Sequence, residues 1–289
     1  MAPERDDRVY KQTHVLGAFI VPFLLVAFVL LYFFPGSTKD YFAWEIHPDI
    51  TPMIMGAGYI AGAYFFTRVY MERLFHRVHV GFLPVTAFTI FMAIASFGHL
   101  DRFIQENVAF WIWMGLYVTT PILVPLAWWV NRKTDPGTPE PGETRLPPGV
   151  RNLLIGAGTV QVLVALFLLL SPSTMIDAWP WTLTPLTAQT LGGWFALPGI
   201  TGIMMGLDGR PSAIRITLQS QAIGLALILL AAARDWGSFD TDNALTYVFV
   251  FGLAGLLVGL LALELYMRRL SPGSSPASPS PPPATPASP

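Results

Sequence analysis

The stretch that decides the fold is FAWEIHP at residues 42–48, because a related stretch, WPWTLTP, follows at residues 179–185. Sliding the sequence against itself by 137 positions pairs the two stretches and their surroundings without a gap. The identical pairs are Pro35 with Pro172, Asp40 with Asp177, Trp44 with Trp181, Pro48 with Pro185, Gly56 with Gly193 and Gly62 with Gly199. Because Trp, Pro and Gly are uncommon, these coincidences indicate an internal duplication.

The composition is typical of a membrane protein. Of the 289 residues, 53% are hydrophobic and only 12% are charged, whereas an ordinary soluble domain has roughly 25% charged residues. Several apolar runs reach the roughly 20 residues that a helix needs to cross a bilayer. Backbone polar groups find no water in the hydrocarbon, so we expect helices, and the runs are too continuous for barrel strands. The sequence therefore predicts an all-α polytopic membrane protein.

Eight apolar segments predict eight transmembrane helices, of which the second and seventh are the weakest. They are residues 15–34, 52–70, 80–97, 108–130, 153–170, 187–207, 214–233 and 244–267. With one residue deleted, the duplication extends through the fourth and eighth segments, where Asn107 pairs with Asn243 and Arg132 with Arg268. Each half then has four helices, an even number, so the two tandem repeats share one orientation about an axis along the membrane normal.

The chain divides accordingly into five parts. They are a cytoplasmic N-terminal segment (1–14), a first four-helix repeat (15–130), a cytoplasmic linker (131–150), a second four-helix repeat (151–270) and a cytoplasmic tail (271–289). The linker is rich in Pro, Gly, Glu and Thr and has no apolar periodicity. The tail is almost entirely Ser, Pro and Ala, which predicts disorder. The first apolar segment is too long for the core of a signal peptide, so we expect it to remain as a span.

The distribution of basic residues predicts the orientation. With eight spans, fourteen of the 17 Lys and Arg residues lie on the side that holds both termini. Only Lys39, Arg102 and Arg234 lie on the opposite, outer side. Because cytoplasmic loops are enriched in Lys and Arg, both termini are expected in the cytoplasm.

Several functions are disfavoured by what the sequence lacks. There is no cysteine, which excludes disulfides, thiol catalysis and thiolate metal sites, and the net charge of −1 gives no basic field for nucleic acid. Away from the helix ends, the predicted spans contain no Asp, Glu, Lys, Arg or His. Ion-coupled carriers use such buried ionisable groups, and so we expect neither ion-driven transport nor a haem held by two histidines, and no cofactor.

Small residues and the duplication together suggest where helices approach one another. Two sets of glycines predict faces for close packing, namely Gly56, Gly58 and Gly62, and Gly252, Gly255 and Gly259. The interface between the two halves is the expected place for a cavity.

The outer side carries the candidate functional residues. A cluster is predicted at His99, Asp101 and Arg102, together with Trp44 and Trp181. His47, Asp49, His99 and Asp101 are candidate ligands of zinc or a similar divalent ion, because imidazole and carboxylate suit such metals. The structural alternative is an interfacial aromatic belt of Trp44, Trp179 and Trp181.

The repeated Trp-x3-Pro spacing also predicts a specific capping turn in each half. In that hypothesis, Asp40 and Asp177 cap a short helix or pair with Arg102 or Arg234. The second half lacks the histidines, so any metal would be confined to the first half.

These residues also carry a resemblance. The run His99-Leu100-Asp101-Arg102-Phe103, the following Trp111, Trp113 and Tyr117, the stretch around Trp44, Pro48 and Thr51, and WPWTLTPLT at residues 179–187 resemble a group of uncharacterised bacterial multi-span proteins. The resemblance covers most of residues 11–270. It implies the duplicated eight-helix architecture in a bacterial cytoplasmic membrane, and it implies no activity, cofactor or site.

The leading functional hypothesis is a non-enzymatic membrane protein that binds or passes a small neutral or lipid-like molecule between its halves. One alternative is a membrane enzyme with an acid and histidine site, with or without a metal, on the outer face. A second alternative is an accessory or scaffold subunit of a membrane complex.

Overall fold

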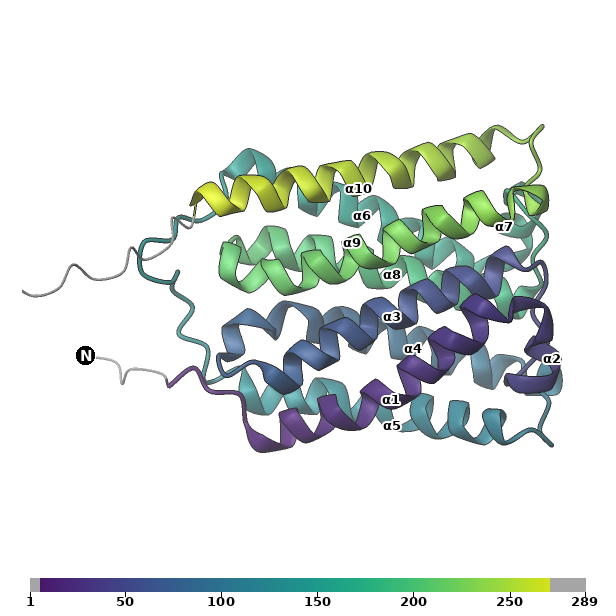
Figure 1. Ribbon diagram of the computed structural model, residues 1–289, viewed down its shortest axis with the longest axis horizontal. Helices are drawn as coiled ribbons and strands as arrows, with labels where there is room; N and C mark the ends of the chain where they lie inside the picture. Colours follow the sequence, from purple (N-terminus) through teal and green to yellow (C-terminus); the bar gives the residue numbers. More distant parts are fainter. Residues whose placement is uncertain (1–5, 271–289) are drawn as a thin grey trace, which may run out of the picture.

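The computed structural model describes residues 6–270, and its regular elements there are helices (Figure 1). The first five residues and the tail predicted to be disordered, 271–289, lie outside the described residues. One isolated bridge pairs Arg8 with Leu74. The prediction of an all-α chain is confirmed for the described part.

Each of the eight predicted segments coincides with a long helix. These helices are α1 (Lys11–Phe33), α3 (Ile50–Met71), α4 (Phe82–Gly98), α5 (Val108–Asn131), α6 (Pro148–Leu170), α8 (Pro185–Asp208), α9 (Pro211–Arg234) and α10 (Ala244–Leu270). Two short helices, α2 (Thr38–Tyr41) and α7 (Pro172–Ala178), follow α1 and α6. A shift of 137 positions superimposes the bounds of α1 on those of α6, and a shift of 136 relates the starts of α5 and α10.

Seven of the long helices are long and apolar enough to cross a membrane, which is compatible with a polytopic membrane protein. The exception is α3, one of the two segments predicted to be weakest. Its neighbours cover it, since 14 of its 22 residues are buried. A helix that is shielded from lipid on most sides can carry the Gly, Tyr and Thr residues that lower its hydropathy.

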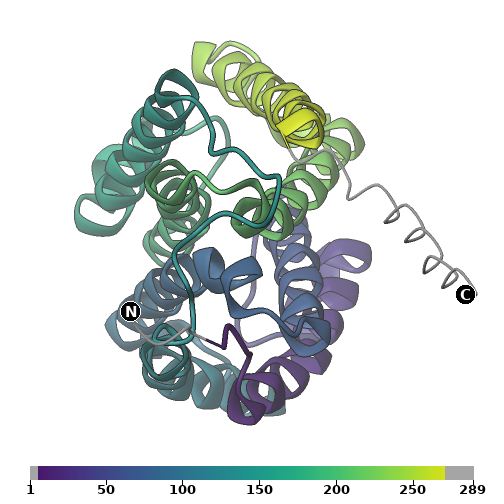
Figure 2. The same ribbon diagram turned by 90° about the vertical axis from the view of Figure 1, so that its left-hand side faces the viewer.

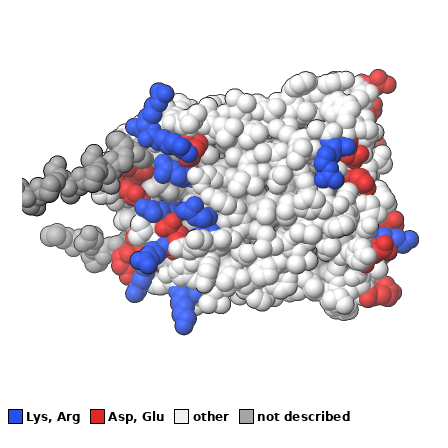
Figure 3. All heavy atoms as spheres, in the orientation of Figure 1, with Lys and Arg blue, Asp and Glu red and all other residues white. Residues whose placement is uncertain are grey.

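The long helices run between the two ends of the bundle (Figure 1). The two ends differ in the charge of their side chains (Figure 3). We call the end where α1 begins and α10 finishes the basic end. The opposite end, which holds α2 and α7, is the acidic end. Lys and Arg gather at the basic end in Figure 3, and the surface between the ends is almost free of charge on the face shown. This pattern is the one expected of a bundle with an apolar band.

Helices from both halves form the centre of the bundle (Figure 2). There α3 packs against α9, and α4 packs against α8. On the outside, α1 packs on α3 and α5 on α4, while α6 packs on α8 and α10 on α9. Every packing relation named for the first half therefore has a counterpart in the second.

Asparagines close the acidic-end loops in matching ways. The amide of Asn107 donates to the carbonyls of Asp40 and Phe42, and the amide of Asn243 donates to those of Ala178 and Trp179. Each asparagine also accepts a backbone N–H in the first turn of the helix that follows it. The predicted capping of a short helix by Asp40 or Asp177 is absent, because α2 and α7 have no side-chain cap. The asparagines instead cap α5 and α10 and bind the loops that follow α2 and α7.

Arg102 and Arg234, the expected partners of Asp40 and Asp177, bind other groups in the structure. Arg102 pairs with Asp101 at 3.2 Å, and Arg234 donates to the backbone carbonyl of Tyr32 at 3.2 Å. The expected pairing of these arginines with Asp40 and Asp177 is replaced by these contacts.

The tryptophans of the repeated stretch are buried inside the protein. Trp44 is 2% exposed and packs against Phe42, Phe103 and Trp113. Trp181 is 3% exposed. It packs in the same way against Trp179, Phe239 and Phe249. The belt interpretation was wrong for these side chains, because a belt residue faces lipid headgroups, whereas these rings fill two aromatic clusters.

The two predicted glycine faces, on α3 and on α10, differ in how closely other helices approach them. A Cβ atom on Gly56 would lie 3.0 Å from the backbone nitrogen of Tyr32, so this glycine allows α1 to approach α3 closely. Gly252, Gly255 and Gly259 have no neighbouring atom within 4 Å of such a position. The predicted close packing at α10 is therefore absent within the described chain, because this face of α10 points outward.

Substitution of either buried tryptophan by alanine tests the aromatic clusters. We expect Trp44→Ala and Trp181→Ala each to lower the free energy of unfolding by about 3–5 kcal/mol, the usual cost of emptying a buried aromatic site. Trp236→Ala is the matched control, because Trp236 lies at the same end and is 40% exposed. Unfolding in detergent, followed by circular dichroism, measures the loss. Equal stability of all three variants would contradict the assignment.

Candidate functional site

The predicted metal ligands at the acidic end do not converge. The His47 ring is 64% exposed and lies 3.1 Å from the carboxylate of Glu45. Nδ1 of His99 lies 3.1 Å from the carbonyl oxygen of Ala95, in the last turn of its own helix. Within residues 6–270, the one group of three His, Asp or Glu ligand atoms close enough to share an ion lies at the opposite end of the bundle. The geometry therefore gives the predicted metal site of His47, Asp49, His99 and Asp101 no support.

The other members of the predicted cluster have separate environments. Asp101 and Arg102 form an ion pair with both side chains more than 70% exposed. Trp44 and Trp181 lie in their aromatic clusters, and Nε1 of Trp181 donates to the hydroxyl of Thr51 at 2.8 Å. That bond joins the two halves. The structure thus distributes the predicted residues between an exposed loop and two packed turns.

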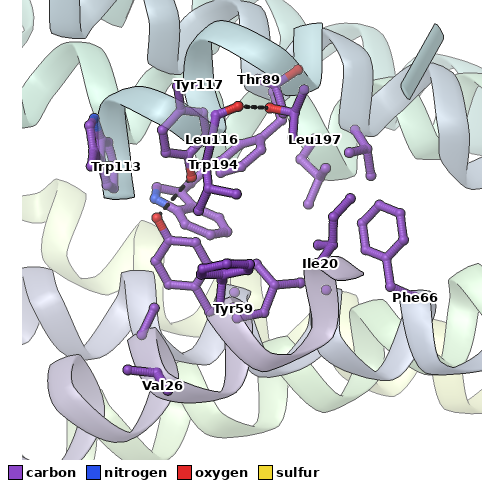
Figure 4. A pocket seen from close by; sticks show the side chains of 18 of the residues that line it. Ile20, Val26, Tyr59, Phe66, Thr89, Trp113, Leu116, Tyr117, Trp194 and Leu197 are labelled. Atoms are coloured by element: carbon purple, nitrogen blue, oxygen red, sulfur yellow. Dashed lines mark hydrogen bonds between the residues drawn. The ribbon is translucent and has the colours of Figure 1, made fainter. Parts of the chain in front are cut away.

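A cavity of about 590 Å³ lies on one side of the bundle, between α1 and α5 (Figure 4). It lies mainly within the first half, whereas the sequence suggested the interface between the halves. Helices α3 and α4 form its floor, and Trp194 and Leu197 of α8 and Gln221 of α9 close its back wall. Its volume is in the range of small-molecule sites.

The mouth of the cavity opens onto the apolar outer surface of the bundle. Three of its lining residues are themselves well exposed, namely Val26 on α1 at 59%, Val108 on α5 at 70% and Ile112 on α5 at 44%. On α5 the lining runs from Val108 to Val124, a rise of about 24 Å. The cavity is therefore a long groove that is open along the side of the bundle.

At the basic end, Asn131 fastens α1 to α5. Its side chain is fully buried and accepts hydrogen bonds from the Thr13 hydroxyl at 2.6 Å and from the Tyr10 backbone N–H at 3.0 Å. Its amide donates to the carbonyl of Arg8. The groove is therefore closed at this end by a satisfied polar contact.

Glycines determine how closely the helices around the groove and their counterparts approach one another. A Cβ atom on Gly58 would lie 2.1 Å from a ring carbon of Trp194, so only glycine leaves room for that ring on the cavity floor. In the second half, α6 lies directly on α8. A Cβ atom on Gly158 would lie 2.4 Å from the carbonyl oxygen of Gly199. Gly158 thus allows α6 to lie on α8, as Gly56 allows α1 to lie on α3.

The polar centre of the cavity is a pair of tyrosines (Figure 4). The hydroxyls of Tyr59 on α3 and Tyr117 on α5 lie 2.9 Å apart, and both side chains are buried. Trp194 crosses the Tyr59 ring edge-on, with 4.9 Å between the ring centroids. Phe88 packs against both Trp194 and Tyr117. Asp40, at the acidic-end rim, is the one charged side chain among the described lining residues.

A second polar cluster lies at the basic end around Arg210, between α8 and α9. The Arg210 side chain is 2% exposed and donates to Asp135 in the linker and to Asp208 at the end of α8, at 2.7–2.8 Å. Nε2 of His79, just before α4, lies 2.8 Å from the Asp208 carboxylate. Ligand atoms of His79, Asp135 and Asp208 lie within 4.8 Å of one another, as a metal site requires. Arg210 already supplies the positive charge between both carboxylates, so we interpret the cluster as an ion-pair network.

Arg210 holds the linker carboxylate in its charged form. Burial alone would raise the pKa of Asp135, but the hydrogen bond from Arg210 and the charge of His79 outweigh it, and the pKa is lowered. The carboxylate therefore stays charged, and the contact with Arg210 persists, to a lower pH than an isolated aspartate allows.

His76 forms a similar contact beside it. One ring nitrogen contacts Asp7 of the N-terminal segment, and the other lies 3.0 Å from Glu140 of the linker. Burial alone would lower the pKa of His76, but the hydrogen bond and charge of Asp7, together with Glu140, outweigh it, and the pKa is raised. The pKa of Glu140 is lowered, because its contacts with Arg77 and His76 outweigh its partial burial. The linker is thus an ordered part of the basic end.

Comparison of the chain with protein-family models, curated proteins and solved structures finds no match in any of the three. The resemblance to bacterial multi-span proteins therefore stays a prediction, and the site has to be interpreted from its own geometry.

Sequence reasoning missed both polar centres. In the sequence, Arg210 is one basic residue of a predicted cytoplasmic loop. The run Asp208-Gly209-Arg210-Pro211 is nevertheless typical of a tight turn after a helix, and Gly209 has φ +74° in the structure. Tyr59 was not singled out, and Tyr117 entered only through the resemblance. A tyrosine in each of two apolar segments gives no signal that the hydroxyls meet.

Replacing Arg210 tests the ion-pair network. We expect Arg210→Gln to lower the free energy of unfolding by about 3–5 kcal/mol, because two buried carboxylates lose their counter-charge. The triple variant D135N/D208N/R210Q removes the uncompensated charges and should recover part of the loss. Arg102→Gln, in an exposed pair, should cost less than about 1 kcal/mol. Equal losses for Arg210→Gln and Arg102→Gln in chemical denaturation would contradict this account.

His76 predicts a pH dependence of stability. Its folded pKa is raised, so its stabilising contribution is present below the unfolded value of about 6.5 and is lost as pH rises through the folded pKa. We expect His76→Gln to lower Tm at about pH 6 and to converge with the wild type at about pH 9. His47→Gln, in an exposed ring, is the control and should match the wild type at both values. A deficit in His76→Gln that is the same at both pH values would show a purely structural role.

Proposed function

We propose that this chain is an eight-span protein of a bacterial cytoplasmic membrane, built from two tandem four-helix repeats of the same orientation. The matched asparagine turns, the paired aromatic clusters and the corresponding packing of the two halves support the duplication. The excess of Lys and Arg at the basic end favours a cytoplasmic location for that end and for both termini. The eighth span in this proposal is α3.

We further propose that the protein binds a small neutral or lipid-like molecule in the groove between α1 and α5. The observation that carries this proposal is the groove of about 590 Å³, apolar along its length, whose mouth opens on the outer surface of the bundle. A charged ligand would meet no opposite charge along the described lining except at the rim, where Asp40 lies. Desolvation of such a ligand would therefore be uncompensated.

The two alternative functions stay predictions. The enzyme hypothesis places its site at His99 and Asp101 on the outer face, with His47 and Asp49 as further candidates, and the one metal-compatible group in the described chain does not include them. Nothing in the described chain identifies a partner for an accessory subunit.

Filling the groove tests the proposed site. Leu116 lines the groove on α5, so Leu116→Trp should lower the amount of co-purified neutral lipid, measured by native mass spectrometry, by about tenfold or more. Ile122 also lies on α5 but is 65% exposed outside the groove, so Ile122→Trp is the matched control and should bind like the wild type. Equal thermal stability of the two variants confirms that folding is intact. Equal lipid binding by both variants, or none by the wild type against a panel of neutral lipids, would overturn the proposal.

A further inference from the structure

The hydroxyl groups that line the groove differ in whether they already donate a hydrogen bond within the protein. Most donate to a backbone carbonyl of a helix, as threonines and serines in membrane helices commonly do. These bonds run from Thr89 to Thr86, Thr120 to Leu116, Thr201 to Leu197, Thr217 to Ile214 and Ser220 to Ala61. The side-chain amides of Gln221 and Asn107 donate to carbonyls as well. These groups have little donor capacity left for a ligand.

The tyrosine pair is the exception. Two hydroxyls 2.9 Å apart form one hydrogen bond, which uses one of their two hydrogens whichever tyrosine donates. Among residues 6–270, neither hydroxyl has another hydrogen-bond partner, so the second hydroxyl hydrogen has no acceptor there. A buried donor without an acceptor costs free energy, and a ligand oxygen in the groove would remove that cost.

Trp194 adds a second unused donor beside the pair. Its indole Nε1 is buried, and the described residues provide it with no hydrogen-bond partner. The Trp194 and Tyr59 rings are in edge-to-face contact, so the indole and the tyrosine hydroxyls line the same part of the groove (Figure 4). An indole N–H only donates, so this part of the groove has two donor hydrogens without an acceptor, one on the tyrosine pair and one on Trp194.

The depth of the pair restricts the ligand further. Tyr59 and Tyr117 are each the tenth residue of a helix that starts at the acidic end, which places them about 14 Å along helices of about 33 Å and 36 Å. A phosphate or ammonium headgroup drawn to this depth would lose its hydration without gaining a counter-charge. A neutral group that only accepts hydrogen bonds avoids that cost.

We propose that the Tyr59–Tyr117 pair, with Trp194 beside it, binds the carbonyl oxygen of an otherwise apolar molecule, such as a long-chain ketone, ester or quinone. This assignment rests on the proposed function of the groove and names the chemical class of its ligand. The hydrocarbon part lies along the apolar groove between α1 and α5, and the carbonyl accepts the hydrogen that the tyrosine pair leaves unused.

The test compares a long-chain methyl ketone with the alkane of the same length, each added to the purified protein in detergent and measured by native mass spectrometry. The wild type should bind the ketone about fivefold to tenfold more tightly, as one added hydrogen bond gives. The infrared carbonyl stretch of the bound ketone should move to lower frequency. Y59F and Y117F each leave one free hydroxyl and should keep the preference. The double variant Y59F/Y117F keeps only the indole of Trp194 as an unused donor, so it should lose most of the ketone preference and most of the infrared shift.

Thr120→Val is the matched control on α5, because the hydrogen of that hydroxyl is already bonded to the Leu116 carbonyl. It should leave the ketone preference unchanged. Equal binding of ketone and alkane by the wild type, or an unchanged preference in the double variant, overturns this inference and leaves the groove as an apolar site. Binding of neither probe by the wild type, together with equal lipid content in Leu116→Trp and Ile122→Trp, overturns the proposed function itself.

Discussion

The constraint on which the rest of this structure depends is that hydrogen bonds in an apolar bundle have to be satisfied without water. Long helices satisfy the backbone, and the hydroxyls of Thr89, Thr120 and Thr201 return to carbonyls of their own helices. Where the chain leaves a helix at the acidic end, Asn107 and Asn243 bind the loop carbonyls. Five buried side-chain nitrogens of the described chain have no partner, on Trp44, Trp128, Trp179, Trp194 and Arg215, and Trp194 is the one of these residues that lines the groove.

The sequence predicted the helices well, because length and apolar composition alone decide where a chain crosses a bilayer. It also identified the repeated Trp44 and Trp181 stretches as special turns, since two rare residues at fixed spacing require a fixed geometry. It did not show how the tryptophan rings of those turns are placed. Composition says that a tryptophan is near the end of a helix, but not whether its ring faces lipid or fills a cluster with Phe103 or Phe239.

The groove was not predictable from the duplication, because it exists where the two halves differ. The shift of 137 positions pairs Trp194 with Ala57, and Tyr59 with Ala196. Trp194 of the second half therefore packs over Gly58 of the first half. The matching position in the first half is Ala57, which has no ring to pack on the second half. The tyrosine pair likewise occurs once. A duplicated scaffold thus carries a single tyrosine pair, in the first half alone.

Polar contacts hold the linker and the two halves together at the basic end. The linker contacts both halves, through Glu140 to His76 and Arg77 of the first half and through Glu143 to Ser212 of the second. In the same region Asn131 fixes α1 to α5. Breaking these buried contacts costs more than separating apolar side chains that lipid then covers, because the polar groups would lose partners that lipid does not replace. At the other end of the groove, its exposed lining residues Val26, Val108 and Ile112 lie nearer the acidic end, on the same side of the clamp at Asn131 as the tyrosine pair.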